Sequence, residues 1–174
     1  MSEVAQVSSA AEAPRYTITS QAIFTDDWQR FTPDAAPLPP EAGNWLVPLD
    51  VWLQHAETLR ARPQPVGVLI APGDDVTRLA GQLHGLALVA VDFPTFTDGR
   101  GFSSGRLLRT RLGWQGELRA VGDVLIDIVH YLARCGFDSF TLKPGHDPEH
   151  AQRQFGVFTV HYQNGYLKPQ ARAA

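Results

Sequence analysis

An arginine- and glycine-rich stretch follows the most apolar run of the chain, and its residue types suit an anion. Its candidate ligands are Asp98, Gly99, Arg100, Gly101, Ser103, Ser104, Arg106 and Arg109. One of the two serines is expected to cap a helix running from about residue 104 to residue 112, and the free N–H groups of a first helical turn attract anions. Guanidinium groups bind sulfate, sulfite or phosphate oxygens through paired hydrogen bonds. We therefore predict an anion site here; the alternative is a glycine turn with solvated arginines.

The same glycines allow a second interpretation, a dinucleotide site. Gly99, Gly101 and Gly105 are spaced G-x-G-x-x-x-G, one residue longer than the dinucleotide fingerprint. In this alternative they lie beneath a pyrophosphate, and Asp123 lies near a ribose. However, the fingerprint turns directly off its strand, whereas residues 94–98 separate these glycines from the preceding apolar run.

Two further loops carry polar residues that could join such a site. Gly122 and Asp123 follow one predicted strand, and Lys143 and His146 follow the next. Asp123 is interpreted either as the N-cap of the following helix or as a carboxylate that orients an arginine or a ligand. His146 and His150 are four residues apart, but a metal site would need a third ligand, so solvated histidines and no metal are predicted.

The only cysteine, Cys135, is predicted to be structural. It lies at the expected C-terminus of a helix, where the dipole disfavours a thiolate. No intramolecular disulfide is available to a chain with one cysteine, which fits a reducing compartment. One thiol also cannot hold an iron–sulfur cluster.

The elements that position these loops alternate between apolar strands and helices. Strands are predicted over residues 45–48, 66–70, 86–93, 117–121 and 137–142, with a helical segment after each. This alternation predicts right-handed βαβ units and an α/β fold with an open, mostly parallel sheet. A doubly wound sheet is the first expectation, and a partial β/α barrel is the alternative. In either arrangement the loops above lie at the carboxyl edge of the sheet, where ligands bind.

Composition restricts the class of protein. The 174 residues carry a net charge of −3, which argues against a nucleic-acid partner. No apolar run approaches the ~18 residues of a membrane span, and the N-terminus lacks the features of a secretion signal, so a cytoplasmic protein without membrane contact is expected. The expected organisation is a disordered arm over 1–15, a hairpin and Pro-rich linker over 16–44, one α/β domain over 45–165 and a flexible tail over 166–174. The hairpin is expected to turn at residues 25–27.

Three sequence blocks resemble a known bacterial family. They are F-x-D-G-R-G-F-S from Phe96 to Ser103, GELRAVGDVL over 116–125 and RCGFDSF over 134–140. With the sequence around them, over about residues 40–165, they are similar to the proteins of domain-of-unknown-function class 934. That family is labelled as oxidoreductases involved in sulfite reduction, because its genes lie beside assimilatory sulfite reductase.

The resemblance brings no catalytic residue or cofactor with it, and it leaves three hypotheses. The first is an accessory protein of assimilatory sulfate or sulfite reduction that binds an oxyanion or a phosphorylated ligand at the strand-end loops. The second is a nucleotide-dependent oxidoreductase. The third is a non-catalytic partner that docks on sulfite reductase. Direct sulfite reduction is not expected, since sirohaem and an iron–sulfur cluster carry that chemistry and the chain has no ligand set for the cluster.

Overall fold

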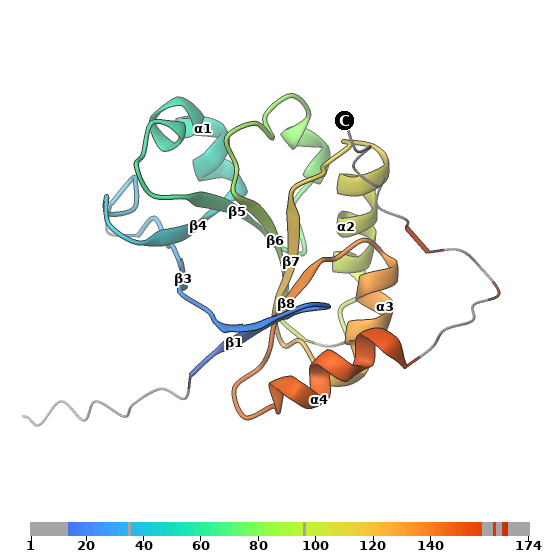
Figure 1. Ribbon diagram of the computed structural model, residues 1–174. Helices are drawn as coiled ribbons and strands as arrows, with labels where there is room; N and C mark the ends of the chain where they lie inside the picture. Colours follow the sequence, from blue (N-terminus) through green and yellow to red (C-terminus); the bar gives the residue numbers. More distant parts are fainter. Residues whose placement is uncertain (1–13, 35, 96, 158–161, 163–164, 167–174) are drawn as a thin grey trace, which may run out of the picture.

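A strongly curled sheet with helices on its outer face forms the protein (Figure 1). The computed structural model describes residues 14–34, 36–95, 97–157, 162 and 165–166. The expectations of an arm before residue 14 and of a tail after residue 166 lie outside the described residues.

Within the described residues, eight strands make up the sheet, in the order β2-β1-β8-β7-β6-β5-β4-β3. They are β1 (Tyr16–Thr19), β2 (Ile23–Thr25), β3 (Trp28–Arg30), β4 (Asn44–Pro48), β5 (Val66–Ile70), β6 (Leu88–Phe93), β7 (Glu117–Gly122) and β8 (Ser139–Thr141). Strands β3 to β8 are parallel and follow one another in sequence order, whereas β1 pairs antiparallel with both β2 and β8. The prediction of a mostly parallel sheet is confirmed.

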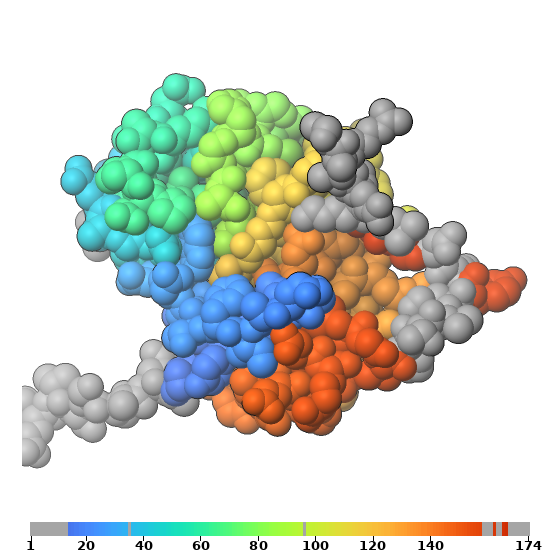
Figure 2. Space-filling view, in the orientation of Figure 1, coloured from blue at the N-terminus to red at the C-terminus, as the bar shows by residue number. Residues whose placement is uncertain are grey.

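The curl of the sheet is that of a half-barrel, the alternative named above. In a doubly wound sheet the strand order reverses at a switch point. Here the parallel strands β3 to β8 keep their sequence order across the sheet, so no such reversal occurs among them. Strands β2 and β3 form the two edges of the sheet, yet only Asp26 and Asp27 separate them in sequence. The chain therefore steps from one edge to the other, and the sheet curls to bring its edges together. In Figure 2 these N-terminal strands form a blue band across the face of the molecule.

A helical segment follows each parallel strand from β4 to β8. The helical segments are α1 (Leu49–Arg60), η1 (Val76–Leu79), α2 (Arg100–Thr110), η2 (Ile126–Ile128), α3 (Val129–Arg134), α4 (Pro148–Arg153) and η3 (Gln154–Gly156). Their buried residues pack on the outer face of the sheet in one large core. Asp75 and Asp147 cap η1 and α4, as their positions predict.

A second, smaller core fills the inside of the curl. It consists of Trp28, Leu46, Leu88, Ala90 and Val121, which come from strands alone and are all at most 8 % exposed. Alternation along β6 and β7 produces the two cores, because successive side chains of a strand point to opposite faces. The half-barrel therefore has a packed interior beneath its carboxyl edge.

Three local predictions are wrong. The N-terminal hairpin turns at residues 20–22, where Thr19 Oγ1 accepts the N–H groups of Gln21 and Ala22, rather than at residues 25–27. Helix α2 begins at Arg100, four residues before the expected start. Asp123 is not the N-cap of a helix, because the next helical turn begins at Ile126 and its N-cap is Leu125. The backbone N–H of Asp123 instead donates a 2.7 Å hydrogen bond to the carbonyl of Phe93 at the end of β6.

Candidate functional site

A pocket opens at the carboxyl edge of the half-barrel, on its inner side. We call it the mouth pocket. Its volume is about 240 Å³, and it is lined by Arg15, Asp26, Trp28, Arg30, Leu46, Val121, Gly122, Thr141, Leu142 and Pro144. The ends of β7 and β8 form one wall, and β3 with β4 forms the other. In complete β/α barrels this edge carries the functional loops.

Two guanidinium groups line the mouth pocket. Arg30 donates a 2.8 Å hydrogen bond to Asp92 at the end of β6, and its side chain is 39 % exposed. Arg15 is half-buried and donates a long 3.4 Å hydrogen bond to the carbonyl of Trp28. Among the described residues Arg15 forms no ion pair. Its charge acts at longer range on the carboxyl group of Asp26 in the same pocket.

The carboxyl group of Asp26 also lines the pocket, although its side chain is only 5 % exposed. Asp26 Oδ1 accepts hydrogen bonds from Trp28 N at 3.4 Å and from Arg119 at 3.0 Å. Burial raises the pKa of this carboxyl above its ordinary value, while Arg119, the Trp28 N–H and Arg15 act in the opposite direction.

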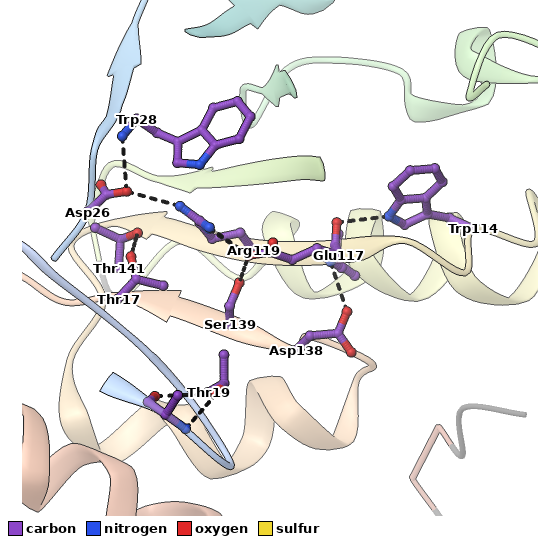
Figure 3. A network of polar contacts seen from close by, with 12 residues as sticks. Thr17, Thr19, Asp26, Trp28, Trp114, Glu117, Arg119, Asp138, Ser139 and Thr141 are labelled. Carbon is purple, nitrogen blue, oxygen red and sulfur yellow. Dashed lines mark hydrogen bonds and ion pairs between the residues drawn. The ribbon is translucent and has the colours of Figure 1, made fainter. Parts of the chain in front are cut away.

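Arg119 holds this carboxyl from below (Figure 3). It projects from β7 into the interior of the curl and is bound on its other side by Glu117, whose Oε1 accepts from Arg119 Nε at 2.9 Å and NH2 at 2.7 Å. Ser139 Oγ donates to the same oxygen. On the neighbouring strands, the hydroxyl groups of Thr17 and Thr141 are 2.8 Å apart and hydrogen-bonded. These side chains form a hydrogen-bonded polar network beneath the pocket, and Asp26 and Thr141 are its members that line the pocket. The network holds these two side chains in place.

The rim of the mouth pocket contains several of the predicted site residues. Gly122 ends β7 with a φ of +98°, and a side chain there would run into the carbonyl of Phe93. Asp123 accepts a 2.8 Å hydrogen bond from Lys143 Nζ, which joins the ends of β7 and β8. His146 lies beside Lys143 in a shallow hollow outside the rim. The structure therefore brings together Gly122, Asp123 and Lys143, whereas His146 lies in a separate hollow next to Lys143.

The start of helix α2 forms a separate group. Asp98 accepts hydrogen bonds from the backbone N–H, Nε and NH2 of Arg100, at 3.1, 2.9 and 2.7 Å. These hydrogen bonds lower the pKa of Asp98 and raise that of Arg100. The guanidinium is 66 % exposed and does not line the mouth pocket. The two residues satisfy each other, and neither lines the mouth pocket together with Gly122.

The glycines of α2 are packing residues in this fold. A Cβ atom on Gly101 would lie 2.5 Å from the ring of Phe93, and one on Gly105 would overlap the ring of Phe137. Both glycines thus let the helix approach two phenylalanines of the outer core. These contacts account for two of the three glycines of the suggested dinucleotide fingerprint, whereas a Cβ atom on Gly99 would meet nothing within 4 Å. Ser103 is exposed, and Ser104 donates to the carbonyl of Arg100 within the helix.

Arg106 and Arg109 are carried away from the carboxyl edge by the helix. Since α2 rises about 1.5 Å per residue, Arg109 lies roughly 13 Å along the axis from Arg100. Arg109 is buried, and its donors bind the carbonyls of Gly136, Trp114 and Gly116 and the carboxylate of Asp138. Arg109 therefore connects α2 to the segments that precede β7 and β8, at the amino ends of these strands.

Comparison with known proteins identifies the family. Residues 67–172 match the family described as bacterial protein of unknown function (DUF934). The chain belongs to the DUF934 family. No curated protein matches it.

The DUF934 match covers β5 to α4, and therefore one wall of the mouth pocket. The blocks GELRAVGDVL and RCGFDSF lie on β7 and β8 and around them, where they supply Glu117, Arg119 and Ser139 of the polar network beneath the pocket. Arg15, Asp26 and Arg30 precede the matched residues. Sequence reasoning missed these three, and the available signal was the alternation of β3, which places Trp28 and Arg30 on the same face.

The remaining chemistry-bearing groups of this DUF934 protein lie elsewhere. Cys135 is half-buried in a groove between α2 and α3 that also contains Gly99, Phe102 and Arg106. Burial raises the pKa of its thiol, while the Arg106 and Arg134 charges lower it. Within the described part of the chain, no three His, Cys, Asp or Glu side chains are grouped as metal ligands. Nor is any described helix long and apolar enough to cross a membrane.

Proposed function

We propose that this protein is a cytosolic accessory protein of assimilatory sulfate or sulfite reduction, and that it binds a small anionic ligand in the mouth pocket. The observation that carries the binding proposal is Arg15: it lines a recessed pocket at the carboxyl edge of a parallel sheet and has no ion pair among the described residues. Arg30 adds a second guanidinium on the same pocket, although it is shared with Asp92. The sulfur pathway is proposed on the label of the family that the chain resembles.

A charge-assisted contact of this kind contributes about 1.5–3 kcal/mol, which is roughly ten- to hundredfold in affinity. The test is calorimetric titration of sulfate, sulfite and phosphate into the wild-type protein and into Arg15→Gln. The wild type is expected to bind at least one of the anions, and the variant to bind it roughly ten- to hundredfold more weakly. Arg153→Gln, an exposed arginine in the last turn of α4, is the matched control and is expected to bind like the wild type.

The segment from Asp98 to Ser104 stays a competing prediction for the anion site. Arg100→Gln separates the two positions, because Arg100 does not line the mouth pocket. Loss of affinity in Arg15→Gln with wild-type affinity in Arg100→Gln supports the mouth pocket. Loss of affinity in Arg100→Gln with wild-type affinity in Arg15→Gln supports an anion site at the start of α2. Absence of binding by the wild type contradicts an anion-binding function.

A further inference from the structure

The mouth pocket contains a hydrogen-bond acceptor, the carboxyl group of Asp26, as well as the guanidinium groups of Arg15 and Arg30. Both hydrogen bonds that Asp26 receives reach Oδ1, from Trp28 N and from Arg119. Oδ2 receives none from the described residues. The carboxyl cannot swing away, because Arg119 is itself held by Glu117. An anion-binding pocket thus contains a fixed carboxyl oxygen that repels a bare anion and attracts a hydrogen-bond donor.

The size of the pocket also exceeds that of a bare oxyanion. The pocket has a volume of about 240 Å³ and is open to solvent. A tetrahedral oxyanion has five non-hydrogen atoms and leaves part of this space unfilled. The remaining lining includes Trp28, Leu46, Val121 and Leu142, which suit a short carbon skeleton.

We propose that the ligand of the mouth pocket is a small organic anion that also carries a hydroxyl or amino group, with the anionic group on Arg15 and Arg30 and the donor on Asp26 Oδ2. This inference rests on the proposed anion-binding function and narrows its ligand class. Asp26 then selects the ligand, and Arg119 is a positioning residue that aims the Asp26 carboxyl.

Matched ligands test the inference in the wild-type protein. Ethanesulfonate, 2-hydroxyethanesulfonate and 2-aminoethanesulfonate share the anionic group and differ in the donor; propionate, lactate and alanine repeat the comparison with a carboxylate. In calorimetric titrations, the hydroxyl or amino compound of at least one set is expected to bind about tenfold or more tightly than its counterpart without the donor. Equal affinities within both sets overturn the inference.

Asp26→Asn tests the residue. The amide oxygen replaces Oδ1 as the acceptor for Arg119 and Trp28, which turns the amide NH₂ group toward the pocket in place of Oδ2. For the amino compounds, whose ammonium group only donates, the affinity ratio relative to the counterpart without the donor is expected to fall to about one. Asp27→Asn, at the exposed neighbouring position, is the matched control and is expected to keep the wild-type ratio. A ratio unchanged in Asp26→Asn overturns the assignment of Asp26.

The two proposals fail in different ways. If all the compounds bind with equal affinity within each set, and Arg15→Gln weakens them together, anion binding stands and the ligand class is wrong. If none of the sulfonates, carboxylates or inorganic anions binds the wild type, the proposed function fails and the inference fails with it. Thermal unfolding of each variant shows whether it is folded, and the wild-type comparison decides the ligand class without any variant.

Discussion

Arg119 donates a 3.0 Å hydrogen bond to Asp26, a residue 93 positions earlier in the chain. The hydrogen bond connects β7, in the middle of the sheet, to the two-residue link between the edge strands β2 and β3. The Arg119 guanidinium also lies over the ring of Phe24 on β2, at 6.0 Å, and over that of Trp28 on β3, at 5.8 Å. One cation therefore contacts both edge strands from inside the curl. This arrangement explains how a two-residue step can join strands at opposite ends of an eight-stranded sheet.

The first prediction concerns the stability of this link. Arg119→Met leaves the buried Asp26 carboxyl, 5 % exposed, without its charged partner. Removing one member of a buried pair typically costs about 3–5 kcal/mol in the free energy of unfolding. Urea denaturation followed by tryptophan fluorescence measures the loss. Arg78→Gln breaks the exposed pair with Asp50, whose side chains are 51 % and 64 % exposed, and is expected to cost at most about 1 kcal/mol. Equal losses in the two variants contradict the role given to Arg119.

The second prediction concerns the pH dependence contributed by Asp26. Because burial raises its pKa in the folded protein, the folded state holds this proton more tightly than the unfolded state does. The contribution of this carboxyl to stability is thus fully present below the ordinary pKa of 3.8 and is lost as the pH rises through the higher folded value. Asp26→Asn lacks this loss.

The unfolding free energy of Asp26→Asn relative to the wild type is therefore expected to increase from about pH 4 to about pH 7. Arg119, Arg15 and Asp27 are the charged groups that act on the carboxyl, and all three are kept in the variant. Urea denaturation at a series of pH values gives the difference. A difference that decreases with pH shows that the folded pKa lies below the unfolded one.

The parallel strands were predictable because their signal is local. Strand β6 is apolar except for Asp92 near its end, and its apolar residues are buried on both faces of the sheet, as the sequence predicts. Gly136 ends its helix with a φ of +106°, and Asp147 caps α4, since both residues act on their immediate neighbours. Alternation of strands and helices was then enough to predict a parallel sheet with its functional loops at the carboxyl edge.

The mouth pocket was not predictable because non-local contacts build it. Strand β1 joins the sheet through β8, in a pairing of Thr17 with Thr141 that nothing in the local sequence of either strand indicates. The start of α2 was missed for a different reason. Its glycines are typical of a loop, and their packing against Phe93 and Phe137 depends on side chains from other elements.

The third prediction concerns Cys135. Burial raises the pKa of its thiol, so less thiolate is present at a given pH than in an unfolded chain. Iodoacetamide is expected to alkylate the native protein more slowly than the urea-unfolded protein, and the rate is expected to reach half its maximum at a higher pH. The single cysteine makes the unfolded chain its own control. Arg106→Gln removes a charge that favours the thiolate and is expected to slow the native reaction further. Faster labelling of the native protein contradicts a structural thiol.

The fourth prediction concerns the glycines of α2. Gly101→Ala places a methyl group against the ring of Phe93, in a packed core where overpacking typically costs about 1–3 kcal/mol. Ala is otherwise the better helix former, by about 1 kcal/mol, so a net loss of stability isolates the steric contact. Ser103→Ala, an exposed position in the same helix, is the control and is expected to change the free energy of unfolding by less than about 0.5 kcal/mol.

Phe93→Leu should make room for the added methyl group. The double variant with Gly101→Ala is therefore expected to lose less unfolding free energy, measured by urea denaturation, than the sum of the two single losses. Additive losses, or a Gly101→Ala protein as stable as the wild type, show that the ring does not require the glycine.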